Sequence, residues 1–218
     1  RLKGKLEHEY LKHGVHIIGR TSWDYAHTQE VNPHTVYHKC NEVLRPLFYI
    51  SDKWTLPNVN KYSVFVSQAG YPIKGLHQIL RAIAIVRNYF PEVSLRVAGI
   101  DITYSGKHHG CWNLDGYGLY IKRLIKNLSL QDCITFTGPL EEEKMVQEFQ
   151  TAHIFVCPSS IENSPNSIGE AQIIGTPCIA SFVGGIPDMI SHERTGLLYP
   201  FEEYSLLASQ IIRIFNNN

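Results

Sequence analysis

The chain has 218 residues, of which 44% are hydrophobic and 18% are charged, the balance of an ordinary globular protein. This length suits one large domain or one and a half small ones. Twenty Lys and Arg residues cancel twenty Asp and Glu residues, which excludes the strongly basic surface of a nucleic-acid-binding protein. No apolar stretch reaches the roughly 18 residues of a membrane-spanning helix, so we expect no transmembrane segment.

The first fifty residues predict short elements joined by polar segments. In chain order these are a charge-rich helix over residues 1–14, an apolar run over 15–18, a helix with Thr21 or Ser22 as N-cap, an extended piece over 35–37 and a helical turn over 42–49. Residues 51–61 contain one proline and two asparagines and predict a linker. Because the chain begins with Arg1 rather than Met, we interpret it as a fragment or a processed product.

The pattern changes at residue 62, where short apolar runs begin to alternate with amphipathic segments. The apolar runs begin at residues 62, 94, 133, 153 and 178, and helices are predicted over residues 74–89, 116–128, 141–152, 164–174 and 202–215. Near-continuous apolar strands that alternate with helices are typical of a parallel sheet covered on both faces. Residues 62–218 are therefore predicted to form an α/β domain with a doubly wound, Rossmann-like sheet.

The cysteines carry information about the compartment. There are five, an odd number, and no C-x-x-C spacing occurs, which argues against a zinc site or a disulfide framework. Cys133, Cys157 and Cys178 lie in apolar runs, where a free thiol behaves as a small hydrophobic side chain. Buried unpaired thiols are typical of a reducing compartment, so we expect a cytoplasmic protein.

In a doubly wound sheet ligands bind at the carboxyl ends of the strands, so the loops there carry function. The fingerprint G-x-G-x-x-G is absent, and the nearest match, Gly116 to Gly118, follows no strand. Its absence argues against a dinucleotide-binding dehydrogenase, which stays only as a distant alternative. The P-loop motif is absent as well, which argues against a P-loop nucleoside triphosphatase. After the first strand, Gly70 predicts a tight turn and Lys74 an ammonium group beside a helix start, which suits a phosphate. The alternative for Lys74 is a solvated side chain.

The loop after the strand at residue 153 has the most distinctive pattern. Ser164 and Pro165 predict a helix start, with Ser164 as N-cap, whose free amides would form a second anion site. Glu162 and Glu170 bracket it in an E-x7-E pattern. Carboxylates only accept hydrogen bonds, so the pair suits the hydroxyl groups of a sugar better than a phosphate. The alternative is a solvated Glu162 and a salt-bridged Glu170.

Six short motifs follow one another in a recognisable order over residues 60–215. They are Lys74-Gly75, TGPL at 137, the E-x7-E pair, GTPCIA at 175, GGIPD at 184 and TGLLY at 195. Together they resemble the donor-binding half of the group 1 (family four) glycosyltransferases, retaining enzymes of the two-domain B fold. IGRTSWD at 18 and CNEVLR at 40 are similar to the end of the first domain in bacterial members that build surface polysaccharide.

The resemblance implies a role for each matching residue. Glu170 would bind the ribose hydroxyls, Glu162 would face the donor sugar and Lys74 would contact the diphosphate, so Glu162 and Lys74 are the implied catalytic residues. The implied donor-binding set also contains Gln68, Gly70, Gly138, Pro139, Leu140, Asn163, Ser164, Asn166 and Ser167. The segment 138–140 would hold the base through its backbone. The chain departs from the family's pattern at Gln68, where many members have Arg, and at residues 163–164, where many have an aromatic residue and a glycine.

The implied reaction is the transfer of a sugar from a nucleoside-diphosphate donor, UDP or GDP, with retention at the anomeric carbon. It requires no metal and no cofactor, and His108 and His109 beside Cys111 are interpreted as a solvated loop. A glycan or lipid-linked acceptor would bind to the missing domain, which would also provide any contact with the inner face of the membrane. The resemblance implies that residues 1–50 are a remnant of the acceptor domain with the interdomain segment. With only about 50 residues before the linker, we expect this chain to transfer no sugar by itself. The alternatives are a nucleotide-sugar epimerase of the same architecture and a non-catalytic nucleotide-binding module.

Overall fold

The computed structural model describes residues 2–104 and 116–217, and its main feature is a six-stranded parallel sheet. In chain order the strands are β3 (Asn60–Val66), β4 (Ser94–Ala98), β5 (Ile134–Gly138), β6 (Ala152–Cys157), β7 (Cys178–Ser181) and β8 (Leu197–Tyr199). They lie in the sheet as β5-β4-β3-β6-β7-β8, with all neighbours parallel. This is the strand order of a doubly wound Rossmann-like sheet, so the predicted fold class is confirmed. The sixth strand, β8, was not predicted.

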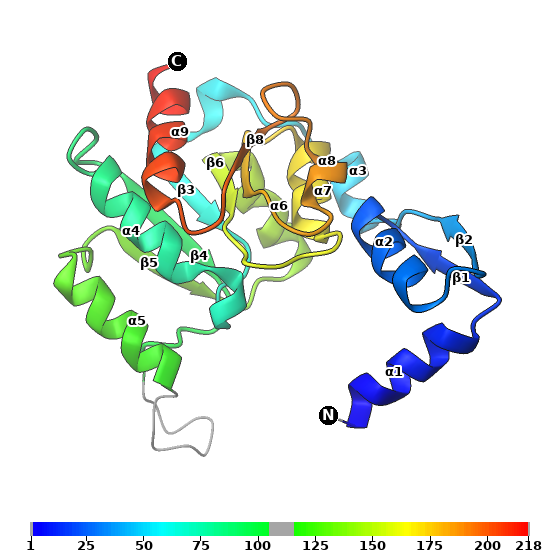
Figure 1. The fold of residues 1–218 in the computed structure, drawn as a ribbon. Helices are drawn as coiled ribbons and strands as arrows, with labels where there is room; N and C mark the ends of the chain where they lie inside the picture. Colours follow the sequence, from blue (N-terminus) through cyan, green and yellow to red (C-terminus); the bar gives the residue numbers. More distant parts are fainter. Residues whose placement is uncertain (1, 105–115, 218) are drawn as a thin grey trace.

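Helices cover both faces of this sheet (Figure 1). One face carries α4 (Leu76–Val86), α5 (Gly116–Asn127) and α9 (Tyr204–Asn216), and the other carries α3 (Pro46–Ile50), α6 (Glu142–Thr151), α7 (Asn166–Ile174) and α8 (Ile186–Met189). In β3, Val64 and Val66 pack into the first layer and Phe65 into the second. Side chains alternate across a strand, so a strand that is apolar throughout must be covered on both sides.

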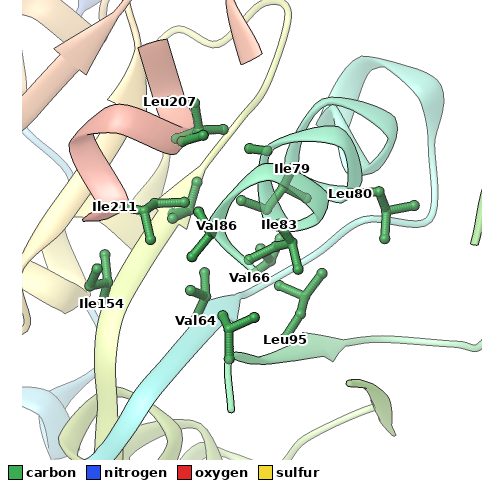
Figure 2. Packing of buried hydrophobic residues seen from close by; sticks show 14 of the residues in the cluster. Val64, Val66, Ile79, Leu80, Ile83, Val86, Leu95, Ile154, Leu207 and Ile211 are labelled. Carbon is green, nitrogen blue, oxygen red and sulfur yellow. The ribbon is translucent and has the colours of Figure 1, made fainter. Parts of the chain in front are cut away.

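The apolar stripe of α4 packs onto the sheet as its spacing predicts. Ile79, Ile83 and Val86 lie against Val64 of β3 and Ile211 of α9, and all five are buried (Figure 2). The helix begins at residue 76, two residues later than predicted, because a 3-10 turn (η2, Pro72–Lys74) precedes it.

The N-terminal residues form a small separate unit beside the sheet domain (Figure 1). It consists of α1 (Leu2–His13), β1 (His16–Gly19), α2 (Ser22–Val31) and β2 (Val36–Lys39), with the two strands paired in parallel. Thr21 is the N-cap of α2, as predicted, and forms a capping box with Asp24. We refer to residues 2–39 as the N-terminal unit.

Residues 46–59 pack on the sheet domain. Phe48 of α3 is fully buried and meets Phe149 of α6 edge to face. The Trp54 indole N–H donates to the Ala152 carbonyl over 2.8 Å, and its backbone N–H donates to the Ile174 carbonyl over 2.7 Å. A 3-10 turn, η1 (Leu56–Asn58), leads into β3. The predicted helical turn over residues 42–49 is shorter, covering Pro46–Ile50, and it belongs to the core of the large domain.

Within residues 2–104 and 116–217, no helix is both long and apolar enough to cross a membrane.

Candidate functional site

A cavity of about 630 Å³ opens at the carboxyl ends of β3 and β6, where the strand order of the sheet reverses. Doubly wound sheets bind ligands at this point, because the loops on its two sides diverge there. The loops after β3, β4, β5 and β6 and the first turns of α7 line the cavity together with one residue that precedes α3.

Most of the predicted donor-binding residues line this cavity. Those that do are Gln68, Lys74, Pro139, Leu140, Glu162, Ser164, Asn166, Ser167 and Glu170. Gly70, Gly138 and Asn163 are not among its lining residues. The cavity also contains Arg45 and Ser159, which sequence reasoning did not select.

At one side of the cavity Lys74 and Glu162 form a short ion pair. The Lys74 Nζ lies 2.5 Å from the Glu162 Oε1, and the side chains are 23% and 15% exposed. The Ser159 hydroxyl, almost fully buried, donates to the same carboxylate oxygen over 2.9 Å. Glu162 is therefore not a solvated side chain, and the Lys74 ammonium retains protons for a second acceptor.

Gly75 allows the two loops that carry this pair to meet. It adopts φ +72°, and a Cβ at this position would lie 1.7 Å from the Pro158 carbonyl oxygen. The Ser160 N–H donates to the Ile73 carbonyl over 2.8 Å and closes the contact. Only glycine satisfies both the left-handed backbone and the approach. Gly70, for which a tight turn was predicted, does not adopt a positive φ.

The two glycines of the GGIPD motif support the Glu162 loop from its other side. A Cβ on Gly184 would lie 1.9 Å from the Glu162 carbonyl oxygen, and one on Gly185 would lie 2.2 Å from the Asn163 carbonyl oxygen. The Gly185 N–H donates to the Glu162 carbonyl over 3.0 Å. Backbone contacts on both sides thus fix the position of Glu162.

The second glutamate of the E-x7-E pair is also ion-paired. The Glu170 Oε1 accepts from the Arg45 Nε over 2.8 Å, and the glutamate side chain is only 7% exposed. Both side chains line the cavity. Each carboxylate in the site is thus paired with a cation, and the two pairs come from four different segments of the chain.

The predicted N-cap of α7 is wrong. The helix begins at Asn166, and Pro165 occupies the N-cap position with extended backbone and no side-chain cap. The Ser164 hydroxyl instead contacts the Met189 sulfur at 3.7 Å. Because no side chain caps α7, the amides of its first turn are free. Asn166 and Ser167 of this turn line the cavity.

Asn163 faces the N-terminal unit. Its amide nitrogen donates to Asp24 over 2.8 Å, and its side-chain oxygen accepts from the Thr21 hydroxyl. Asp24 also accepts from the Tyr37 hydroxyl and from the Arg20 N–H. We call Thr21, Asp24 and Asn163 the latch.

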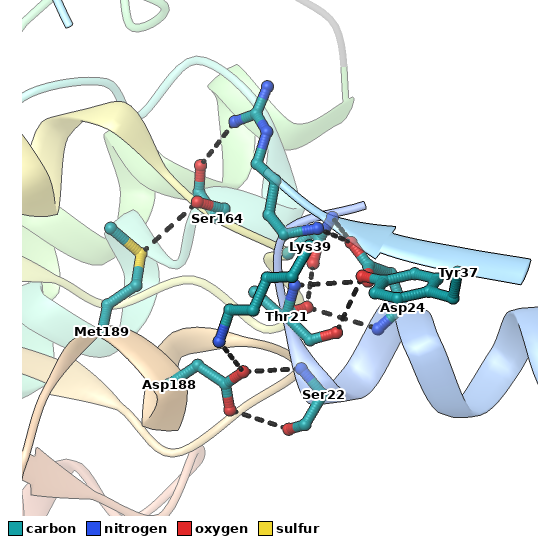
Figure 3. Close-up of polar contacts among 10 residues, drawn as sticks. Thr21, Ser22, Asp24, Tyr37, Lys39, Ser164, Asp188 and Met189 are labelled. Carbon is teal, nitrogen blue, oxygen red and sulfur yellow. Dashed lines mark hydrogen bonds and ion pairs between the residues drawn. The ribbon is translucent and has the colours of Figure 1, made fainter. Parts of the chain in front are cut away.

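A second contact connects the N-terminal unit with α8. Figure 3 shows Asp188 facing Ser22 and Lys39, and Ser22 donates to Asp188 through its hydroxyl over 2.7 Å and through its N–H over 2.5 Å. The latch and this contact place the N-terminal unit against the loops that follow β6 and β7.

The latch shifts the pKa values of its members. Burial alone would raise the pKa of Asp24, but hydrogen bonds from the Arg20 N–H, Tyr37 and Asn163 outweigh it and lower the pKa below the ordinary 3.8. Burial, followed by the hydrogen bond to Asp24, raises the pKa of Tyr37 to about 12. The charged form of Asp24 is therefore the one that the folded protein favours.

The Asp24→Asn variant should lose about 1 to 3 kcal/mol of unfolding free energy at pH 7, because hydrogen bonds to a charged acceptor are lost. The pKa of Asp24 is lowered on folding, so its contribution is present above pH 4 and is lost as the pH falls through the folded-state pKa. Urea unfolding between pH 7 and pH 2.5 should show a steeper acid-side loss in the parent than in Asp24→Asn. Asp52→Asn, which removes an exposed carboxylate without a side-chain contact among the described residues, is the control. Identical acid-side slopes in all three proteins would rule out the latch as a source of stability.

The thiol in the cavity wall is not a nucleophile. Burial, with a smaller contribution from Glu162, raises the pKa of Cys157 to about 11, so the thiol stays protonated at neutral pH. Cys40, Cys133, Cys157 and Cys178 are free thiols. Among the described residues, no three His, Cys, Asp or Glu side chains are grouped as a metal site would require. His108, His109 and Cys111, interpreted above as a solvated loop, lie outside the described residues.

Comparison with known proteins places this chain in a family. Among curated relatives, the D-inositol 3-phosphate glycosyltransferase of Streptomyces scabiei (strain 87.22) is 30% identical over 127 residues, which cover 58% of this chain and 27% of that protein. The amylovoran biosynthesis glycosyltransferase AmsK of Erwinia amylovora is 29% identical over 150 residues, covering 64% of this chain and 37% of that protein. This chain thus spans roughly a third of these relatives.

The fold is shared with a solved structure, that of Anabaena Alr3699/HepE in complex with UDP-glucose. The TM-score is 0.75 at 19% identity, over 93% of this chain and 54% of that one. The sequence profile of a family described as "Glycosyl transferases group 1" matches residues 50–218, well over half of the chain. The resemblance found in the motifs is therefore confirmed, and the chain belongs to the group 1 glycosyltransferases.

Proposed function

We propose that the cavity binds a nucleoside-diphosphate sugar and that the whole protein, of which this chain is the donor-binding part, transfers the sugar to an acceptor with retention. The observation that carries the proposal is the pair of carboxylate–cation contacts, Lys74–Glu162 and Arg45–Glu170, in one cavity at the switch point of the sheet. A nucleotide sugar offers an anionic diphosphate between two groups rich in hydroxyls. The alternation of cations and carboxylates complements that chemistry.

Lys74 and the first turn of α7 are the proposed diphosphate site. The Lys74 ammonium has protons left beyond the one on Glu162, and the amides of Asn166 and Ser167 have no partner within their helix. As the bond from sugar to phosphate breaks, negative charge accumulates on the leaving diphosphate. Fixed donors around it stabilise that charge more than they stabilise the intact donor, which is how such groups accelerate the reaction.

The two glutamates are the proposed contacts for the hydroxyl groups. Glu162, beside Lys74, would face the donor sugar, and Glu170 would accept from the ribose hydroxyls. Pro139 and Leu140, which follow β5 at the wall of the same cavity, would lie against the base.

Relatives suggest a donor and an acceptor class. The structure of HepE contains UDP-glucose, so a uridine donor is the first candidate and a guanosine donor the second. AmsK takes part in amylovoran biosynthesis, which favours a glycan or lipid-linked acceptor of a surface polysaccharide for this protein too. The free, buried thiols favour the cytoplasm as the compartment, with contact at the inner membrane face through a further domain.

Calorimetry with UDP, GDP, ADP and CDP tests the proposal. We expect one of them to bind to the 218-residue chain, and we expect Lys74→Met to weaken that binding about 10- to 150-fold, because one charge-assisted hydrogen bond is lost. Lys126→Met, which removes an exposed lysine from the last turn of α5, is the control and should leave the affinity unchanged. The proposal fails if none of the four nucleotides gives heat at millimolar concentration, or if Lys74→Met binds as tightly as the parent.

A further inference from the structure

Arg45 ends the CNEVLR segment and lines the cavity, but sequence reasoning gave it no role at the site. It lies outside the E-x7-E loop and outside the sheet, in the segment that joins β2 to α3. Its Nε donates to Glu170 over 2.8 Å, and the two residues are 125 positions apart in the sequence. Glu170, the proposed contact for the ribose hydroxyls, is thus paired with Arg45 in the absence of a ligand.

Contacts with α3 and α6 hold the Arg45 guanidinium group in place. The Arg45 Cζ lies 4.7 Å from the centre of the Phe48 ring. Phe48, a residue of α3, is fully buried where α3 packs against α6. The Leu47 N–H donates to the Glu142 carboxylate of α6 over 3.2 Å. Both contacts fix α3, and with it the direction in which Arg45 points.

The segment before Arg45 is fixed as well. Leu44 packs onto α7 at Gly169, where a Cβ would lie 2.7 Å from the Leu44 Cδ1. Gly169 precedes Glu170, so the close approach of the segment and the position of the carboxylate depend on one turn of helix. This accounts for a glycine inside α7 that neither a cap nor a turn requires.

The Arg45–Glu170 ion pair compensates the cost of a buried charge. A carboxylate that is 7% exposed costs free energy unless a charge and hydrogen bonds compensate it. Arg45 compensates one oxygen of Glu170, while the other accepts no hydrogen bond from the described residues, and Glu170 lines the cavity. The Nη groups of Arg45 donate to none of the described residues, and the side chain is 37% exposed. Among the described residues that line the cavity, Arg45 and Lys74 are the two cations, because Gln68 stands where many family members have Arg.

We infer that Arg45 is a positioning residue that orients Glu170 for the two ribose hydroxyls of the nucleotide and so sets the selectivity of the site for ribose over 2′-deoxyribose. The inference rests on the proposed function. Arg45 fixes the rotamer of the carboxylate, so that its free oxygen faces the vicinal hydroxyls. Without Arg45, Glu170 would turn toward solvent, and the site would lose the distinction between the two sugars.

Calorimetry with UDP and GDP and with their 2′-deoxy forms tests this inference. The parent should prefer the ribose form at least about tenfold, the value of one hydrogen bond to a charged group. Arg45→Gln should weaken binding of the ribose form about tenfold and bring the preference close to one. Arg45→Lys keeps the charge without the planar fork and should fall between the two. The control variant Arg87→Gln removes the arginine at the end of α4, which pairs with Asp132, and it should bind both forms as the parent does.

The outcomes separate the inference from the proposed function. If the parent binds none of UDP, GDP, ADP and CDP, the proposed function fails. If it binds only ADP or CDP, the same comparison is made with that nucleotide and its 2′-deoxy form. If the parent prefers the ribose form and both Arg45 variants keep that preference, the proposed function stands and the inference is wrong. If the parent binds both forms equally, the inference is also wrong. Unfolding temperatures of the unliganded proteins identify a variant that has lost its fold, and Arg45→Lys then decides the matter, because it keeps a cation beside Glu170.

Discussion

Gly75→Ala should destabilise the protein by about 2 to 5 kcal/mol and abolish measurable binding of the nucleotide. Two independent costs combine. A left-handed conformation costs a residue with a Cβ about 1 to 2 kcal/mol, and the added carbon would lie 1.7 Å from a backbone oxygen of Pro158. Such an overlap moves backbone, which costs about 1 to 3 kcal/mol more. The displaced Pro158 precedes Ser159, so the Glu162–Lys74 pair would move with it.

Gly138→Ala is the matched control, because Gly138 has φ +75° but nothing within 4 Å of its Cβ position. Only the conformational cost applies there, so we expect a loss of about 1 to 2 kcal/mol. Urea unfolding of the parent and of both variants measures the difference, which reports the contact with Pro158 alone. Equal losses in the two variants would show that the approach of the two loops is not tight in solution.

The sheet was predictable because its signal is local. Five of its six strands are apolar runs, such as residues 153–157, whose side chains are buried on both faces. The sixth, β8, has three residues between Gly196 and Pro200, so it resembles a turn. A strand this short is identified by its pairing with β7, which the sequence pattern does not contain.

The lining of the cavity was predictable where loops at the strand ends supply it. Lys74 and Glu162 lie in loops that follow strands and Glu170 in the second turn of α7, and these are the positions where doubly wound sheets bind ligands. The misplaced N-cap shows the limit: the Ser164 hydroxyl contacts Met189, 25 residues further on, instead of capping the helix that follows it.

The contacts between side chains that lie far apart in the sequence were not predicted. Asn163 looked like a departure from a family pattern, and the structure gives it partners 139 and 142 positions away, Asp24 and Thr21. Arg45 meets its carboxylate 125 positions later. Nothing in the neighbourhood of either residue encodes the contact, since the N-terminal unit meets the loop before α7 and the segment that follows β2 meets α7 itself.

Neutralisation of the two glutamates of the E-x7-E pair should affect binding of the bare diphosphate differently. Glu170→Gln should weaken binding of the nucleoside diphosphate about 10- to 150-fold, because the charged acceptor for the ribose hydroxyls is lost. The fold should survive, since the glutamine keeps the shape and an oxygen for Arg45, whose side chain is 37% exposed.

Glu162→Gln removes the negative charge 2.5 Å from the Lys74 ammonium, which then becomes wholly available to phosphate. Affinity for the bare diphosphate should therefore hold or rise, while the nucleotide sugar loses the hydrogen bond of its sugar hydroxyls to the carboxylate. Calorimetry with UDP and UDP-glucose measures both ligands on both variants. Glu193→Gln, which breaks an exposed ion pair with Arg213, is the control for removal of one carboxylate and should change neither affinity. The assignment of the two roles fails if Glu170→Gln binds the diphosphate as tightly as the parent. It also fails if the two variants weaken both ligands equally, because the carboxylates would then act through the total charge of the cavity and not through separate contacts with ribose and sugar.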